Sequence, residues 1–299
     1  MTSPLQRLAA GLIVALHLTA CGLPGNEANP RTGGPAASQR IVTLSPHLAE
    51  LVFAVGSGHQ LVGVSAYTDY PAAVTDLPVI GDAFNIDQER LTLLEPDLLL
   101  AWDTGTPAHV IDELRNRGYT VEVITTTSLS DIGAALKRIG ALTGRESDAT
   151  AAADSFSAGL DDIARQSTGA ASIDVFYQVY RRPLYTINGT HFVSQLIELC
   201  GGRNVFDDLD GLAPLISVEA MLERNPEVIL ASTDAGQLAF EEWERWPDLP
   251  ANRFGNRYLI PANDIGRPTP RLLAGARAVC EALQKSRDNR EAKTHDRAA

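Results

Sequence analysis

Two segments of this chain, 130 residues apart, repeat one pattern. Residues 86–102 (IDQERLTLLEPDLLLAW) and 216–232 (ISVEAMLERNPEVILAS) align without a gap. In each copy a residue that can cap a helix, Asp87 or Ser217, precedes two turns of helical pattern that end at a proline. The apolar run that follows is typical of a buried strand. A helix–strand unit built twice predicts two lobes of one design with a cleft between them.

The rest of the chain follows an α/β alternation. Short apolar runs predict strands, and the segments between them carry apolar residues at helical spacing, as in parallel sheets covered by helices. We therefore expect an α/β fold with two sheet-and-helix lobes, 40–145 and 169–284, joined by one long helix over 146–168. The charged stretch 285–299 has no apolar period and is predicted to be disordered.

The first residues are typical of an export signal. A short apolar run after Arg7 predicts a signal peptide over 1–20. The letters LTAC, which end at Cys21, resemble the lipobox of bacterial lipoproteins and predict lipidation of that cysteine; an ordinary secretory signal with a chance cysteine is the alternative. Residues 21–39 are rich in Gly and Pro and predict a flexible tether. The expected location is the periplasm or another extracytoplasmic face, with the lipid on Cys21 as the only anchor.

Composition and motifs argue against several classes of partner. The formal net charge of −12 disfavours nucleic acid and anionic lipid bound through a basic face. The histidines are scattered, and neither a metal-binding spacing nor a P-loop nor a dinucleotide fingerprint is found. We expect neither a metal site nor a resident cofactor.

Cys200 and Cys280 are an even pair in a chain that is predicted to be exported, where oxidation favours disulfides. Their bond would close a loop of about 80 residues and would stabilise the fold by on the order of 4 kcal/mol in the chain-entropy description. Two free thiols, buried on apolar helix faces, are the alternative.

Aromatic and charged residues gather after the predicted strands. Ligands of open α/β sheets bind outside the carboxyl ends of the strands, and an aromatic pocket with few charges suits a large, partly planar ligand. The candidate ligand-binding residues are Tyr67, Phe84, Trp102, Tyr185, Trp246, Asp264 and Arg267, with Trp243 as an alternative to Trp246. Several of the aromatic side chains could instead belong to the core. Nearby Arg271 could reach a ligand or form a salt bridge between lobes.

Ser45, His47 and a carboxylate offer a rival reading as an exported serine hydrolase. However, no G-x-S-x-G elbow surrounds Ser45, and Ser45-Pro46 is a typical helix start. We expect these residues to cap a helix and the protein not to be an enzyme.

Glu89 and Glu219 occupy the same position in the two copies of the repeat. Each lies in the first turn of its predicted helix, where the helix dipole favours a carboxylate, and this alone would explain them. Two equivalent negative charges could also be recognised together by a pseudo-twofold partner with basic pockets.

The segments RIVTLSPHLAEL, GVSAYTDYP, NIDQERLTLLEPDLLLAW, LIELCGGRNVF, ISVEAMLERNPEVIL and RPTPRLLAGARAVCEAL together resemble the substrate-binding proteins of ABC importers whose lobes are joined by one helix. Within that class, the resemblance is strongest to the periplasmic cobalamin-binding family. It implies a bilobed periplasmic-binding-protein fold, a Cys200–Cys280 disulfide, and docking of Glu89 and Glu219 on arginines of the membrane permease. It also implies a ligand cleft formed by Tyr67, Phe84, Trp102, Asp264 and Arg267.

We therefore expect a non-enzymatic, lipid-anchored binding protein of an ABC importer. Cobalamin or a related corrinoid is the favoured ligand. Haem and ferric siderophores are the alternatives, because binding proteins for them share the scaffold and the paired glutamates.

Overall fold

The computed structural model describes residues 39–298. The predicted signal peptide (1–20), the lipidation site Cys21 and all but the last residue of the tether (21–39) lie outside the described residues. The elements in chain order are β1 (Ile41–Thr43), α1 (Pro46–Ala54), η1 (Gly58–Gln60), β2 (Leu61–Gly63), η2 (Ala72–Val74), α2 (Gln88–Leu94), β3 (Leu98–Trp102), α3 (Ala108–Asn116), β4 (Val121–Ile124), α4 (Leu129–Thr143), α5 (Glu146–Gln166), β5 (Ile173–Gln178), α6 (Phe192–Leu199), β6 (Gly202–Asn204), α7 (Val218–Arg224), β7 (Val228–Ser232), η3 (Thr233–Ala235), η4 (Gln237–Arg245), α8 (Pro250–Phe254), β8 (Arg257–Ile260), α9 (Ala262–Ile265) and α10 (Leu272–Ala298).

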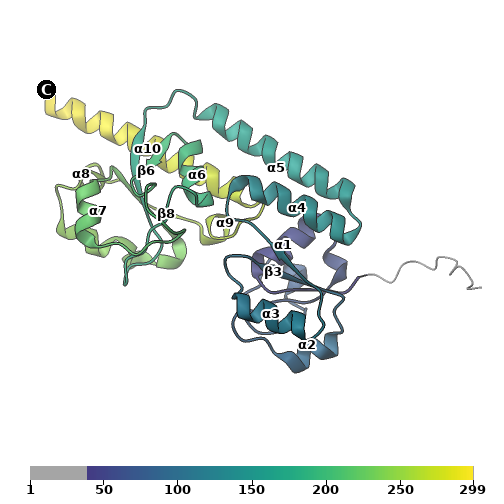
Figure 1. Cartoon of the computed structure of the whole chain (residues 1–299). Helices are drawn as coiled ribbons and strands as arrows, with labels where there is room; N and C mark the ends of the chain where they lie inside the picture. The colour runs from purple at the N-terminus through teal and green to yellow at the C-terminus, as the bar shows by residue number, and fades with distance from the viewer. Residues whose placement is uncertain (1–38, 299) are drawn as a thin grey trace, which may run out of the picture. The chain divides into compact units, whose positions relative to one another are not determined.

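Two parallel four-stranded sheets organise these elements (Figure 1). The first has the order β2-β1-β3-β4, and the second has the equivalent order β6-β5-β7-β8. We call residues 39–145 the first lobe and residues 167–298 the second lobe. Because each sheet is covered by helices, its central strands are buried on both faces, which explains why they are apolar without alternation.

The repeated sequence unit folds in the same way in both lobes. Helices α2 and α7 start after caps whose side chains, Asp87 and Ser217, accept a hydrogen bond from a backbone N–H three residues on. Each helix buries one apolar residue completely, Leu91 or Met221. The strands that follow, β3 and β7, hold the same third position in their sheets. The sequence prediction of two lobes of one design is confirmed.

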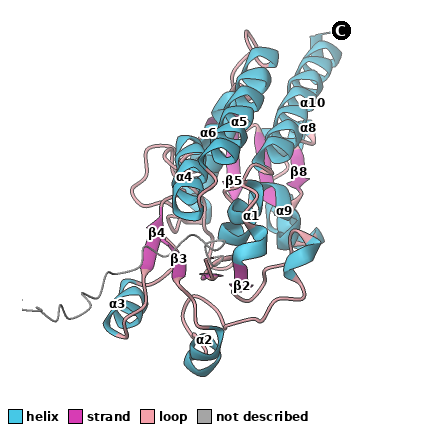
Figure 2. Cartoon of the chain, turned by 90° about the vertical axis from the view of Figure 1, so that its right-hand side faces the viewer, coloured by secondary structure: helices cyan, strands magenta, loops and turns pink. Residues whose placement is uncertain are grey.

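The lobes share a core as well as a connecting helix. Helix α5 packs along α4 and contacts α6 and α10 of the second lobe (Figure 2). One hydrophobic cluster runs through both lobes, from α1 and α4 through Phe156 of α5 to α6 and α10. On its opposite face, each sheet packs against a smaller hydrophobic cluster of its own lobe. The lobes are therefore held by burial of apolar surface, and α5 is only one part of that contact.

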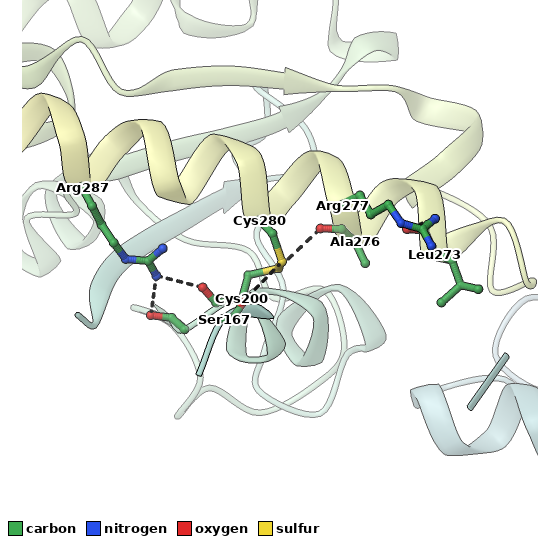
Figure 3. Close-up of a disulfide and its surroundings, with 8 residues drawn as sticks. Ser167, Cys200, Leu273, Ala276, Arg277, Cys280 and Arg287 are labelled. Carbon is green, nitrogen blue, oxygen red and sulfur yellow. Dashed lines mark hydrogen bonds between the residues drawn. A yellow bond between two sulfur atoms is a disulfide. The ribbon is translucent and has the colours of Figure 1, made fainter. Parts of the chain in front are cut away.

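Helix α10 contradicts the prediction of a disordered tail. It continues to Ala298, and Ser286 and Arg287 within the supposed tail are buried. Arg287 donates hydrogen bonds to the carbonyl oxygens of Cys200 and Gly201 at the end of α6, 2.8 and 3.1 Å away (Figure 3). The prediction failed because polar side chains occupy the buried positions of this segment, so its helical period is not apolar.

Cys200 and Cys280 join the end of α6 to α10 as a disulfide in this structure, with Cα atoms 4.8 Å apart (Figure 3). Arg287 lies two turns further along the same helix and contacts the same end of α6. The disulfide and these hydrogen bonds therefore hold α10 against the end of α6.

No helix among residues 39–298 has both the length and the apolar character needed to cross a bilayer.

Candidate ligand-binding cleft

A cavity of about 350 Å³ lies between the carboxyl ends of the two sheets. Its walls come from both lobes: residues at or beyond the ends of β3 and β4 on one side, and of β5, β7 and β8 on the other. The lining consists of Trp102, Thr104, Thr126, Thr127, Tyr177, Val179, Ile187, His191, Phe192, Val193, Leu212, Ala213, Ser232, Asp234, Ala262, Ile265 and Gly266. Most of these side chains are apolar or carry a neutral hydroxyl, as expected for a small-molecule pocket.

The sequence repeat continues across this cavity. Trp102 has the repeat counterpart Ser232, and Thr104 and Asp234 stand two residues beyond the repeated segments at the same spacing of 130 residues; all four line the cavity. Equivalent positions at the ends of β3 and β7 therefore contribute to both walls. The walls differ in chemistry, because the first lobe supplies an indole and the second supplies a carboxylate.

Two titratable side chains in the lining are kept neutral by burial. Desolvation lowers the pKa of His191 to about 4. Its Nδ1 accepts a hydrogen bond from the backbone N–H of Val193, which leaves the proton of the neutral ring on Nε2. Burial also raises the pKa of Tyr177, and the negative charge of Asp234 raises it further. Tyr177 is therefore a neutral phenol at ordinary pH.

A second hollow, of about 420 Å³, lies on the first lobe beside the cavity and shares Trp102 with it. Tyr67 and Phe84 line this hollow and are 84% and 69% exposed, so both offer aromatic surface to a ligand. Gly105 lies against the indole of Trp102, where a Cβ would clash with the ring. The structure thus brings together three of the predicted aromatic residues.

Tyr185 and the two late tryptophans occupy other places. Tyr185 forms isolated bridges with Tyr180 and Leu215 and does not line the cavity. Trp243 is fully buried and donates a hydrogen bond to Gln178, 2.7 Å away. The ring of Trp246 packs beside that of Trp243, with centroids 5.9 Å apart, at the edge of the second lobe's core. Neither tryptophan belongs to the lining of the cavity or of the hollow.

Arg267 and Asp264 lie in an ion-pair network between the lobes. The buried carboxylate of Glu50, on α1, accepts hydrogen bonds from Arg267 at 2.9 Å and from Thr269 at 3.0 Å. Arg267 also pairs with Asp69 of the first lobe. These hydrogen bonds outweigh the effect of burial and raise the pKa of Arg267.

The same network holds the other charged candidates. Arg271 pairs with Glu50 at 3.5 Å and with Asp264 at 3.3 Å, and its guanidinium stacks over the ring of Tyr70. Of the two roles that the sequence suggested for Arg271, contact with a ligand or a salt bridge between lobes, the structure shows the salt bridge. Asp264 and Arg267 are paired with protein groups and do not line the cavity, although Gly266 between them does.

Comparison with known proteins agrees with this architecture. The sequence pattern of the periplasmic binding protein family matches residues 41–263. The chain belongs to the periplasmic binding protein family. It is 32% identical to the vitamin B12-binding protein of Vibrio campbellii over 86% of this chain and 93% of that protein. It is also 32% identical to the vitamin B12-binding protein of Pectobacterium carotovorum, over 84% of this chain and 91% of that one.

Solved structures of periplasmic binding proteins have the same fold as this chain. The periplasmic vitamin B12-binding protein BtuF of Vibrio cholerae aligns with a TM-score of 0.75 and 31% identity, covering 83% of this chain and 98% of that chain. The periplasmic haem-binding protein HutB of Vibrio cholerae aligns with a TM-score of 0.73 and 21% identity, covering 83% and 99%. The second likeness concerns the fold alone. Relatives and fold both indicate a bilobed binding protein and not an enzyme.

Ser45 stands at the N-cap position of α1, as expected, but its side chain makes no capping hydrogen bond and contacts His47 instead. Ser45 Oγ lies 2.8 Å from His47 Nδ1, but the other ring nitrogen faces the Thr126 hydroxyl at 3.3 Å and not a carboxylate. Desolvation, followed by the charge of Arg267, lowers the pKa of His47 to about 3. The ring also packs edge-on against Trp102, with centroids 4.8 Å apart. His47 therefore supports the indole wall of the cavity from behind.

Glu89 and Glu219 lie at matching positions in the first turns of α2 and α7, and both are exposed. The structure thus leaves both carboxylates accessible to a partner.

Much of the cavity lining was missed from the sequence, including Thr126, His191 and Asp234. Only Asp234 carried a usable signal, since it stands two residues after the end of the second repeated segment, as Thr104 does after the first.

Proposed function

We propose that this chain is the substrate-binding component of an ABC importer and that it carries cobalamin or a related corrinoid in the cleft between its lobes. The main support is the likeness to proteins named for vitamin B12 binding, at 31–32% identity over more than four fifths of the chain. The cleft chemistry agrees with this proposal. A corrin is a broad macrocycle around a cobalt ion, and its edge carries apolar methyl groups and neutral amide groups.

The two adjoining spaces suit a ligand of this kind. Trp102 belongs to the lining of both the cavity and the hollow, so one large ligand can contact it while extending toward Tyr67 and Phe84. Aromatic side chains bury much area at a low cost in conformational entropy. The hydroxyls of Thr104, Thr126 and Thr127 can exchange hydrogen bonds with peripheral amides.

Titration of the purified protein with cyanocobalamin, haemin and a ferric siderophore tests the ligand. We expect heat of binding with cyanocobalamin and a corrinoid absorption spectrum in the complex. Saturable binding of haemin with a Soret band, or of the siderophore with charge-transfer absorbance, in the absence of cyanocobalamin binding would support the alternative ligands and refute the corrinoid assignment.

A pair of matched variants tests the site. Phe84 and Leu93 are both exposed apolar residues of the first lobe, but only Phe84 lines the hollow. Burial of a phenylalanine is worth roughly 1.5–3 kcal/mol, so Phe84→Ala should weaken cyanocobalamin binding by about tenfold or more. Leu93→Ala should leave the Kd unchanged. Equal Kd values for both variants would place the ligand elsewhere.

We further propose that Glu89 and Glu219 dock the loaded protein on basic pockets of the permease dimer. Reversal of both charges to Lys should abolish complex formation with the permease without changing ligand affinity. Asp112→Lys with Glu198→Lys is the control, because both residues are exposed and lie on α3 and α6. If the control pair weakens the complex as much as the Glu89 and Glu219 pair, the specific docking role is wrong.

Anchoring through a lipid on Cys21 belongs to the same proposal and rests on the lipobox. We expect the mature protein to fractionate with membranes and its first peptide to carry acyl chains in mass spectrometry. Cys21→Ser should release a protein with an unchanged Kd for its ligand. Retention of the variant in the membrane fraction would contradict the lipid anchor.

A further inference from the structure

One wall of the cavity carries a carboxylate that faces no Lys or Arg within the lining. Asp234 follows β7, lines the cavity and is exposed to solvent. None of the side chains of residues 39–236 and 238–295 forms a hydrogen bond or salt bridge with its carboxylate. Within the lining there is no Lys or Arg. Arg267 follows the lining residue Gly266 in sequence, but its guanidinium is paired with Glu50 and Asp69.

The charge of Asp234 acts inside the cavity. Burial raises the pKa of Tyr177, which lines the same wall, and the charge of Asp234 raises it further. The other polar groups of the lining are neutral: threonine and serine hydroxyls, the Tyr177 phenol and the His191 ring. A ligand carboxylate placed at this wall would therefore meet a like charge with no compensating cation, whereas an amide N–H would find an acceptor.

We infer that Asp234 is a specificity-determining residue, which accepts hydrogen bonds from neutral amide donors of the ligand and rejects ligands that present a carboxylate to this wall. This inference rests on the proposed function, because peripheral amides distinguish corrinoids from haem, whose corresponding edge carries propionates. The first lobe differs here, since the residue that lies 130 positions before Asp234 and lines the same cavity is the uncharged Thr104. Among the lining residues, the carboxylate thus belongs to the second lobe alone.

Binding measurements with Asp234→Asn and Asp234→Thr test this inference. The Asn variant keeps the size and one acceptor oxygen, and the Thr variant copies the repeat counterpart. The probes are cyanocobalamin, the monocarboxylic acids made from it by hydrolysing one peripheral amide, and haemin. Asp248→Asn is the control, because it makes the same charge change at an exposed residue outside the cavity.

We expect both Asp234 variants to bind haemin and at least one monocarboxylic acid more tightly than the wild type, by roughly fivefold. Cyanocobalamin should bind no more tightly and should bind more weakly to Asp234→Thr. The gain for anionic probes should shrink as the salt concentration rises from about 0.05 M to about 1 M, because the repulsion is screened. Asp248→Asn should change none of these values.

An equal change for neutral and anionic probes, or a gain that salt does not reduce, would overturn the role of Asp234. Failure of the wild type to bind cyanocobalamin would instead refute the proposed ligand. The haemin comparison between wild type and variants still reports on Asp234 in that case. The two failures are therefore distinguishable.

Discussion

The buried carboxylate of Glu50 should be worth about 2 kcal/mol to the folded protein. Its side chain is only 3% exposed and faces Arg267 and Arg271, whose side chains are 18% and 23% exposed. Loss of one partner from a buried ion pair typically costs about 3–5 kcal/mol, because the remaining charge stays buried without compensation. Here the cost is reduced, since each arginine keeps a second carboxylate, Asp69 or Asp264.

Glu50→Gln removes the charge and keeps the shape. We expect the free energy of unfolding in a denaturant titration to fall by about 2 kcal/mol, and the melting temperature to fall by roughly 5 °C for a chain of this size. Glu122→Gln is the control, because its pair with Arg138 is on the surface and should cost no more than about 0.5 kcal/mol.

A double-mutant cycle separates the ion pair from other effects of the substitution. Glu50→Gln and Arg267→Gln should be non-additive, with a coupling of about 1 kcal/mol or more. If the two changes add, or if Glu50→Gln costs no more than the surface control, then the network does not join the lobes energetically and the reasoning from burial is wrong.

Three further predictions concern the second lobe. Free-thiol titration of the unfolded protein should find neither Cys200 nor Cys280 reactive before reduction, and reduction should lower stability by about 2–4 kcal/mol. Arg287→Met should lower stability by about 2 kcal/mol because three carbonyl groups lose their donor; no change would show that the end of α10 is undocked. For His191, the pKa of about 4 lies below the unfolded value of 6.5. The unfolded state then binds more protons between these values, so unfolding free energy should rise with pH from about 4 to 6.5, and less steeply in His191→Asn.

Local structure was largely predictable from the sequence because it depends on neighbours along the chain. The caps Asp87 and Ser217, the prolines after them and the apolar strands act within a few residues of one another. Their repetition at a constant spacing also indicated two equivalent lobes. Trp102 was recognised as a cleft residue for the same reason, since it ends a buried strand and precedes polar residues.

The site needed information that no local pattern contains. Trp243 and Trp246 look alike in sequence, yet Gln178, 65 residues away from Trp243, supplies the hydrogen-bond partner that keeps that ring in the core. Arg267 follows the last strand as a ligand-binding residue would. Its side chain is instead drawn to Glu50, 217 residues earlier, because a buried carboxylate needs a cation.

The sequence by itself determined the duplicated α/β design, because helix caps, strand burial and turn chemistry are short-range properties that survive in any arrangement of the lobes. Only the tertiary structure decided which charges neutralise one another and which remain. Arg267 and Arg271 form ion pairs with Glu50 at the junction of the lobes, whereas Asp234 lines the cavity. Pairing of charges depends on distance in space, and the packing of one lobe on the other sets that distance.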